Sequence, residues 1–197
     1  MNAPDIVRRV VESLEEIDLP YMLVGSFSSN VYSIPRSTRD ADFVVNPASG
    51  QLHELATHLG PDFALDFQIQ FETITGTRKN IAHVVGSEFE IELFRLSTDA
   101  HDQERFQRRV RRQTHGFSVW VPTVEDVVVT KLRWAVGALR NKDRDDIREV
   151  LTVQEGQLDW KYVHRWATEH GTRACLDDII RSIPADLLAP GSYPVSE

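Results

Sequence analysis

Apolar residues near the start of the chain recur at the spacing of a helix. Ile6, Val10, Leu14 and Ile17 lie about one helical turn apart, which predicts a helix from Asp5 to Ile17. Asp5 is the residue that we expect to cap it, because a carboxylate at this position accepts a hydrogen bond from a free backbone N–H.

The remaining chain reads as a strand-rich part followed by a helical part. Apolar and β-branched runs predict strands over Tyr21–Val24, Arg39–Val45, Phe67–Thr75, Asn80–Val85, Phe89–Leu96 and Phe117–Val121. Helices are predicted over Ser26–Ser33, Leu52–Leu59, Ala100–Arg112, Thr123–Leu139, Asp143–Val153, Trp160–His170 and Cys175–Ile183. This order favours an α+β fold, with a small mixed β-sheet flanked by helices and then a C-terminal helical segment.

The chain has 197 residues, a length that fits one compact domain with a small appendage. We expect a core over residues 1–122, a helical segment over 123–190 packed on that core, and a flexible tail over 191–197. No apolar run is long enough to predict a membrane span, and the N-terminus lacks the pattern of a secretory signal. One cysteine excludes an internal disulfide and a cysteine-cluster zinc site. A cytoplasmic protein is therefore expected.

The net charge of the chain excludes few classes of binding partner. The formal net charge is −8, which argues against a surface coated with basic residues for DNA binding. It leaves room for a local basic strip that contacts a nucleic acid, and surplus acid is also consistent with a site that gathers divalent cations.

A pair of carboxylates on one predicted strand is the most informative pattern. Asp40 and Asp42 are two residues apart, so they face the same side of a strand while Ala41 and Phe43 face the other. Two adjacent carboxylates repel each other, and a divalent cation relieves that repulsion. Mg²⁺ prefers such hard oxygen ligands and usually retains water and substrate phosphates as further ligands.

Gly25-Ser26 supplies a complementary feature for an anion. Glycine allows close approach of a backbone, and a helix that begins here directs free N–H groups at a phosphate. The predicted helix is short enough for the chain to return, which would place Asp40 beside Gly25 on a strand antiparallel to the first.

These residues resemble a known signature. Gly25-Ser26 and Asp40-Ala41-Asp42, each beside apolar strand residues, look like the motif of the DNA polymerase β-like nucleotidyltransferase superfamily. The run from Arg36 to Phe43 is similar to that of AbiEii-type toxins and related bacterial proteins. The resemblance implies the nucleotidyltransferase fold, an NTP as co-substrate, two Mg²⁺ ions, and nucleotide binding by Gly25, Ser26 and Arg36.

The same pattern implies a third carboxylate on a neighbouring strand. Ile91-Glu92-Leu93-Phe94 fits its context, with Glu in place of the more common Asp. Glu88, Glu90 and Glu92 would share one strand face. We prefer Glu92 as metal ligand or general base, with Glu90 as the alternative.

Two later motifs extend the resemblance to Ile147. Lys131, within an apolar helix, is implied to meet nucleotide phosphates, and Asp143 is implied to help the catalytic centre, with Asp146 as the alternative. From the helix pattern alone, Lys131 could equally direct its ammonium group to solvent, and Asp143 could simply cap a helix.

The sequence therefore predicts a Mg²⁺-dependent nucleotidyltransferase whose acceptor is tRNA, a protein or a small molecule. One version is a toxin with a neutralising antitoxin protein as partner. Another transfers the nucleotidyl group to an aminoglycoside or lincosamide antibiotic. The alternative of another class is a nucleotide-binding or partner-binding module that has lost turnover, which the Glu at the third position keeps open.

Overall fold

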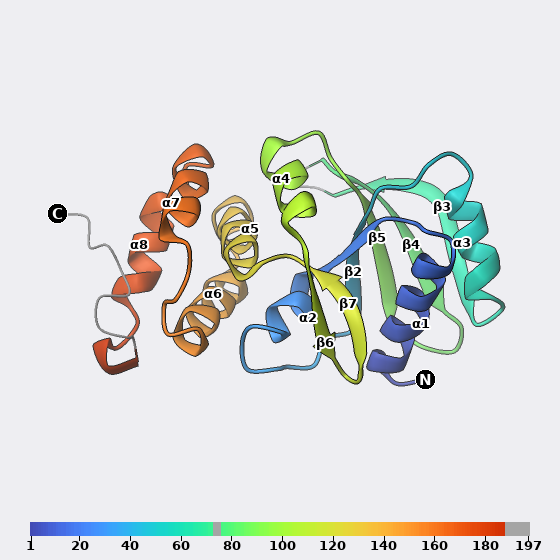
Figure 1. Cartoon of the computed structure of the whole chain (residues 1–197), viewed down its shortest axis with the longest axis horizontal. Coiled ribbons are helices and arrows are strands. Elements are labelled where there is room, and N and C mark those ends of the chain that lie inside the picture. Colours follow the sequence, from blue (N-terminus) through green and yellow to red (C-terminus); the bar gives the residue numbers. More distant parts are fainter. Residues whose placement is uncertain (73–75, 188–197) are drawn as a thin grey trace. The chain divides into compact units, whose positions relative to one another are not determined.

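A computed structural model describes residues 1–72 and 76–187, which form two compact units. The first unit comprises Met1–Ser28 and Arg36–Pro122, and the second comprises Ser29–Pro35 together with the chain from Thr123 onward. The helix and strand labels used below are those of Figure 1.

A five-stranded sheet organises the first unit. Its elements are α1 (Ala3–Glu16), β1 (Tyr21–Val24), α2 (Gly25–Asn30, whose last two residues fall in the second unit), β2 (Asp40–Val45), α3 (Gln51–Leu59), β3 (Phe63–Phe71), β4 (Arg78–Val84), β5 (Glu90–Arg95), α4 (Ala100–Arg108), β6 (Val110–Thr114) and β7 (Phe117–Val121). The strand order is β1-β2-β5-β4-β3, and β6 and β7 form a separate hairpin. Only the β2–β5 pair is parallel among the neighbouring strands of this sheet. The predicted mixed sheet of an α+β fold is therefore confirmed.

One face of the sheet carries the core of this unit. Ala41, Phe43, Ile91 and Leu93 lie on this face, which we call the rear face, and all four are completely buried. Helices α1 and α3 lie along it (Figure 1) and bury their apolar sides. The opposite face, which we call the acidic face, carries the carboxylates of β2 and β5.

Part of the acidic face is covered by α4. Phe106 on this helix packs with Met22 of β1 and Val44 of β2, and Phe94 and Leu96 extend the cluster. Because apolar contacts occupy that end of the face, the carboxylates are confined to the other end of the strands.

Two local predictions about helix ends were wrong. The first helix is capped by Asn2, whose Oδ1 accepts the Asp5 N–H at 2.9 Å, so Asp5 lies within the first turn instead of capping it. Pro4 is tolerated there because the N–H groups of a first turn have no helical partner.

The predicted helix Ala100–Arg112 ends at Arg108, and the chain continues as β6. His115 and Gly116 both adopt positive φ values, which is the backbone geometry of a tight hairpin, and they join β6 to β7. Val110 therefore pairs with Val121 across the hairpin rather than extending the apolar side of the helix. The remaining predicted elements are present with shifts of a few residues at their ends.

The second unit is helical from Thr123 onward. It contains α5 (Val124–Gly137), α6 (Asn141–Val153), α7 (Trp160–Glu169), α8 (Arg173–Arg181) and a short 3₁₀ helix (Ala185–Leu187). Its core is made of completely buried apolar side chains from all four α-helices, including Val128, Leu132, Ile147, Leu151, Val163 and Leu176. Tyr162 adds a buried hydrogen bond from its hydroxyl to Asp126 at 2.6 Å.

Some predictions concern residues outside this description. The end of the strand predicted over Phe67–Thr75 and the flexible tail over 191–197 lie outside the described residues. Packing of segment 123–190 on the core stays a prediction. Among the described residues, every helix is too short or too polar to cross a bilayer.

Candidate active site

Four carboxylates gather on the acidic face of the sheet. Asp40 and Asp42 on β2 stand directly opposite Glu90 and Glu92 on β5 in the register of the parallel pair. Side chains on neighbouring strands that share a face are about 5 Å apart, and residues two apart on one strand are about 7 Å apart. The two predicted Asp residues therefore face the same side, together with both candidates for the third acid.

The chain passes close to Asp42 where β1 ends. Val24 pairs with Asp42 in the antiparallel β1–β2 register, and Gly25 follows with a φ of +62°. The backbone of Gly25 lies against the Asp42 carboxylate so closely that a Cβ atom would overlap it. The chain thus returns to the Gly-Ser turn on an antiparallel strand as predicted, but the register places Asp42 against Gly25 where Asp40 was expected.

Arg36 brings a positive charge to the same turn. Its Nη2 atom donates to the Ser26 hydroxyl at 3.2 Å, and the Ser28 hydroxyl donates to the Gly25 carbonyl at 2.9 Å. The three residues that were predicted to bind nucleotide in this part of the chain therefore lie together beside Asp42.

A lysine on β4 contacts one of the two glutamates. Lys79 Nζ lies 2.6 Å from Glu92 Oε1, and the two side chains are only 16% and 21% exposed. Glu90 instead meets His83 at 3.3 Å, where both side chains are about half exposed. Glu92 is thus the less exposed of the two, and it stands opposite Asp42, the residue that lies against Gly25.

Sequence reasoning missed Lys79, because its approach to Glu92 depends on how β4 pairs with β5. Thr38 was missed as well. Its hydroxyl donates to Asp40 Oδ1 at 2.6 Å and orients that exposed carboxylate. Thr38 belongs to the motif run before Asp40, which was the available signal for it.

The later motif residues meet one another in the second unit. Lys131 is 9% exposed, and its Nζ donates to Asp143 at 2.9 Å and to Asp146 at 2.5 Å. The ammonium group is therefore directed inward to two buried carboxylates and does not reach for solvent. A role of these residues in nucleotide binding or catalysis stays a prediction.

Comparisons with solved structures identify the fold. The antibiotic-resistance factor ANT(2'')-Ia superposes with a TM-score of 0.58 at 11% identity, over 92% of this chain and 98% of its own. An antigenic nucleotidyltransferase-like protein from Paracoccidioides brasiliensis gives a TM-score of 0.56 at 15% identity, over 93% and 95%. JHP933 from Helicobacter pylori gives 0.53 at 16% identity, over 90% and 75%. No curated protein matches the chain. The fold is that of the nucleotidyltransferases.

The particular family follows from the sequence match. Residues 5–181 match the family described as nucleotidyltransferase of unknown function (DUF6036), and the chain belongs to this family. It is an enzyme of the nucleotidyltransferase class. The predicted superfamily is thereby supported, whereas a closer relation to AbiEii-type toxins stays a prediction.

Proposed function

We propose that this enzyme moves a nucleotidyl group from an NTP to an acceptor hydroxyl or phosphate with release of pyrophosphate, using Mg²⁺ held by Asp40, Asp42 and Glu92. The main support for this proposal is that the Gly25 backbone, Asp42 and Glu92 lie next to one another on three adjacent chain segments. It sets a glycine turn for phosphate directly beside carboxylates for a cation.

The donor set fits a divalent metal. Asp40, Asp42, Glu90 and Glu92 place four carboxylates on two adjacent strands, and Lys79 offsets only part of their charge. Hard oxygen ligands of this kind suit Mg²⁺, and the two ions that they would hold would supply positive charge to the attacking and the leaving oxygen. In this proposal Glu92 also accepts the proton of the acceptor hydroxyl.

The phosphates are assigned to the Gly25-Ser26 turn that directly follows β1. Gly25 allows their close approach, while Ser26 and Arg36 offer a hydroxyl and a guanidinium at one point. Lys131 and Asp143 are included in the proposal on the resemblance of their motif. Because the side chains perform little covalent chemistry, they contribute to catalysis mainly by positioning the substrates and neutralising charge.

Two classes of acceptor follow from different observations. The resemblance to toxin-like proteins favours tRNA or a protein as acceptor, with an antitoxin as partner in the cytoplasm. The likeness to ANT(2'')-Ia, which has been solved in complex with adenylyl-2''-tobramycin, favours an aminoglycoside hydroxyl. At 14% identity the likeness shows a shared fold, and the label-transfer experiment below distinguishes the two acceptor classes.

Label transfer tests the proposal. The full chain is incubated with each α-labelled NTP, Mg²⁺, and total tRNA, protein extract, aminoglycosides or lincosamides. We expect label on one acceptor class, lost on chelation of the metal and reduced at least about a hundredfold by Asp42→Asn. Asp62→Asn, which removes the same charge from an exposed loop position, serves as the matched control and should retain activity.

The same experiment distinguishes an active transferase from a nucleotide-binding or partner-binding module. Nucleotide binding that depends on Mg²⁺ and on Asp42, without label transfer to any of the four acceptor classes, would favour a module that has lost turnover. A parallel incubation with γ-labelled NTPs detects a phosphotransferase, which would move the γ label to the acceptor and leave the α label on the released nucleotide.

A further inference from the structure

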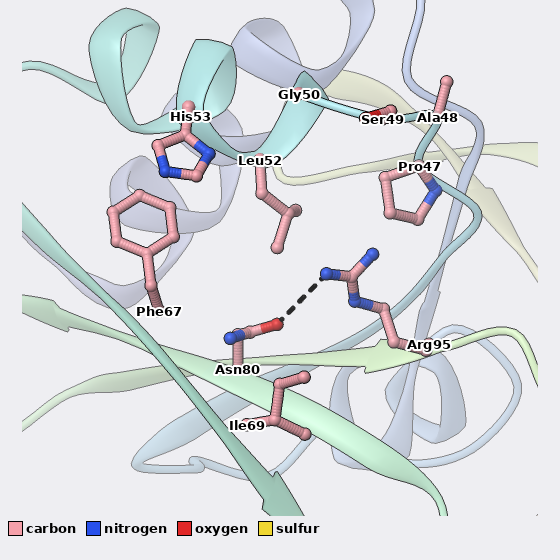
Figure 2. A pocket seen from close by; sticks show the side chains of 10 residues that line it. All are labelled: Pro47, Ala48, Ser49, Gly50, Leu52, His53, Phe67, Ile69, Asn80 and Arg95. Carbon is pink, nitrogen blue, oxygen red and sulfur yellow. Dashed lines mark hydrogen bonds between the residues drawn. The ribbon is translucent and has the colours of Figure 1, made fainter.

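A pocket lies on the rear face of the sheet, opposite the face that carries the carboxylates. It has a volume of about 340 Å³ and is bounded by the loop after β2, the start of α3, and strands β3, β4 and β5, all within the first unit (Figure 2). Arg95 and Glu92 are three positions apart on β5, so their side chains project from opposite faces of the sheet. Pockets of about 300–1,000 Å³ are the usual size for small-molecule ligands.

Arg95 provides this pocket with a positive charge. Its Nη2 donates to Asn80 Oδ1 at 3.4 Å, and among the described residues no carboxylate forms an ion pair with it. Asn80 is held in turn, because its Nδ2 donates to the Asp66 carbonyl at 3.1 Å. Figure 2 shows the guanidinium directed into the space between the loop and the strands.

The surroundings of Arg95 disfavour its charge. Partial burial lowers the pKa of its guanidinium, and the neighbouring charge of Arg78 lowers it further. Arginine remains protonated at any physiological pH, so the local excess of positive charge persists. An anion bound in the pocket would offset that excess.

A flat aromatic wall stands across the pocket from the guanidinium. The rings of His53 and Phe67 stack with centroids 4.2 Å apart and planes 11° apart, and Figure 2 shows them opposite Arg95. Leu52 and Ile69 contribute apolar surface between the two ends. Phe67 and Ile69 are 44% and 48% exposed, which is unusual for side chains of this size.

We propose that this rear pocket binds a small organic anion that carries a flat ring. Its carboxylate or phosphate contacts Arg95, whose guanidinium is oriented by its bond to Asn80 Oδ1. Its ring packs against Phe67 and the neighbouring apolar side chains. The ligand is recognised at one end by charge and at the other by apolar contact. This site is separate from the acidic face and does not depend on the function proposed for that face.

Titrations of the full chain with two anionic probes and their neutral counterparts test this site. Benzoate and adenosine 5'-monophosphate are compared with benzamide and adenosine, in the presence of a chelator and in the Asp42→Asn background, which together suppress metal-dependent binding at the acidic face. We expect at least one anion to bind, its neutral counterpart to bind at least about tenfold more weakly, and Arg95→Gln to weaken the anion at least about tenfold. Arg112→Gln makes the same charge change at an exposed position on β6, outside the pocket, and should alter binding less than about threefold.

Methyl NMR of the unmutated chain provides a readout that does not depend on the folding of a variant. Binding should shift the methyl signals of Leu52 and Ile69, which line the pocket, and leave Ile81 on the acidic face unmoved. The proposal is wrong if neither anion binds, if Arg95→Gln binds the anion as well as the unmutated chain, or if the shifts fall on Ile81 instead. Binding of benzoate but not of adenosine 5'-monophosphate would identify an aromatic carboxylate as the ligand class. Binding of adenosine 5'-monophosphate but not of benzoate would identify a nucleoside phosphate.

Discussion

Gly25 and Asp42 lie so close together that a Cβ atom at position 25 would stand 1.9 Å from the Asp42 Oδ2 oxygen. Gly25 also has a φ of +62°, a conformation that other residues adopt only with strain. A side chain at this position must therefore displace the carboxylate that we assign to the metal.

The substitution Gly25→Ala is expected to lower both stability and nucleotide binding. Gly86→Ala is the matched control, because Gly86 also has a positive φ but has open space where its Cβ would be. The control should cost about 1–2 kcal/mol of unfolding free energy from backbone strain alone. Gly25→Ala should cost more and weaken Mg²⁺-dependent nucleotide binding at least about tenfold. Equal behaviour of the two variants in urea unfolding and binding assays would contradict the close approach.

The two glutamates of β5 should differ in their effect on turnover. Glu92→Gln removes a carboxylate next to Asp42, so we expect transfer activity to fall at least about a hundredfold. Glu90→Gln removes one that stands next to the exposed Asp40, and we expect a loss below about tenfold. Initial rates at saturating nucleotide decide between them, and a larger loss from the Glu90 variant would reverse the assignment.

Lys79 is expected to weaken the affinity of the site for Mg²⁺. Its ammonium lies 2.6 Å from a carboxylate that we assign to the metal, so it repels a cation bound to the same group. Lys79→Met should therefore lower the Mg²⁺ concentration for half-maximal nucleotide binding by about threefold or more. Lys161→Met, at an exposed position on α7, is the control for loss of a positive charge. A higher Mg²⁺ requirement in Lys79→Met would mean that the lysine is needed to hold Glu92 in place.

Lys131 should matter for the stability of the helical unit. Lys131→Met removes the ammonium group that contacts both buried carboxylates, Asp143 and Asp146, which is expected to cost about 3–5 kcal/mol of unfolding free energy. Arg140 also approaches Asp143, at 3.3 Å, but its side chain is 45% exposed, and Arg140→Gln should cost less than about 1 kcal/mol. Urea unfolding followed by circular dichroism measures both. A small loss in Lys131→Met would mean that the two carboxylates find other partners.

Cys175 reports on the packing of α8. Burial raises the pKa of its thiol, while the charge of Arg144, whose Nη1 lies 3.0 Å from the sulfur, acts in the opposite direction. Because the thiolate is the reactive form, the midpoint of the pH–rate profile for alkylation in the folded chain should lie above that of the unfolded chain. Arg144→Gln should move it higher still, whereas Arg148→Gln should not, since Arg148 contacts Asp145 and Ser182 instead. Identical midpoints in the folded and unfolded chain would contradict the buried position.

Local sequence patterns were enough to assign the strand that carries the two aspartates and the glycine turn before it. Alternation along a strand is a local property, so Asp40 and Asp42 could be assigned to one face without knowledge of the rest of the fold. The hairpin that replaces the end of the fourth helix was also encoded locally, by His115-Gly116, but its signal was outweighed by the helical spacing of Phe106 and Val110.

The groups that these aspartates meet come from segments distant in sequence, so local patterns could not identify them. The choice between Glu90 and Glu92 depends on the parallel register of β2 and β5, and the contact of Lys79 with Glu92 depends on the pairing of β4 with β5. The pocket around Arg95 brings together four chain segments that are distant in sequence. Such contacts are fixed by the register of strands and by the packing of helices, which depend on the whole chain at once, whereas the periodicity of a single strand depends on a few neighbouring residues.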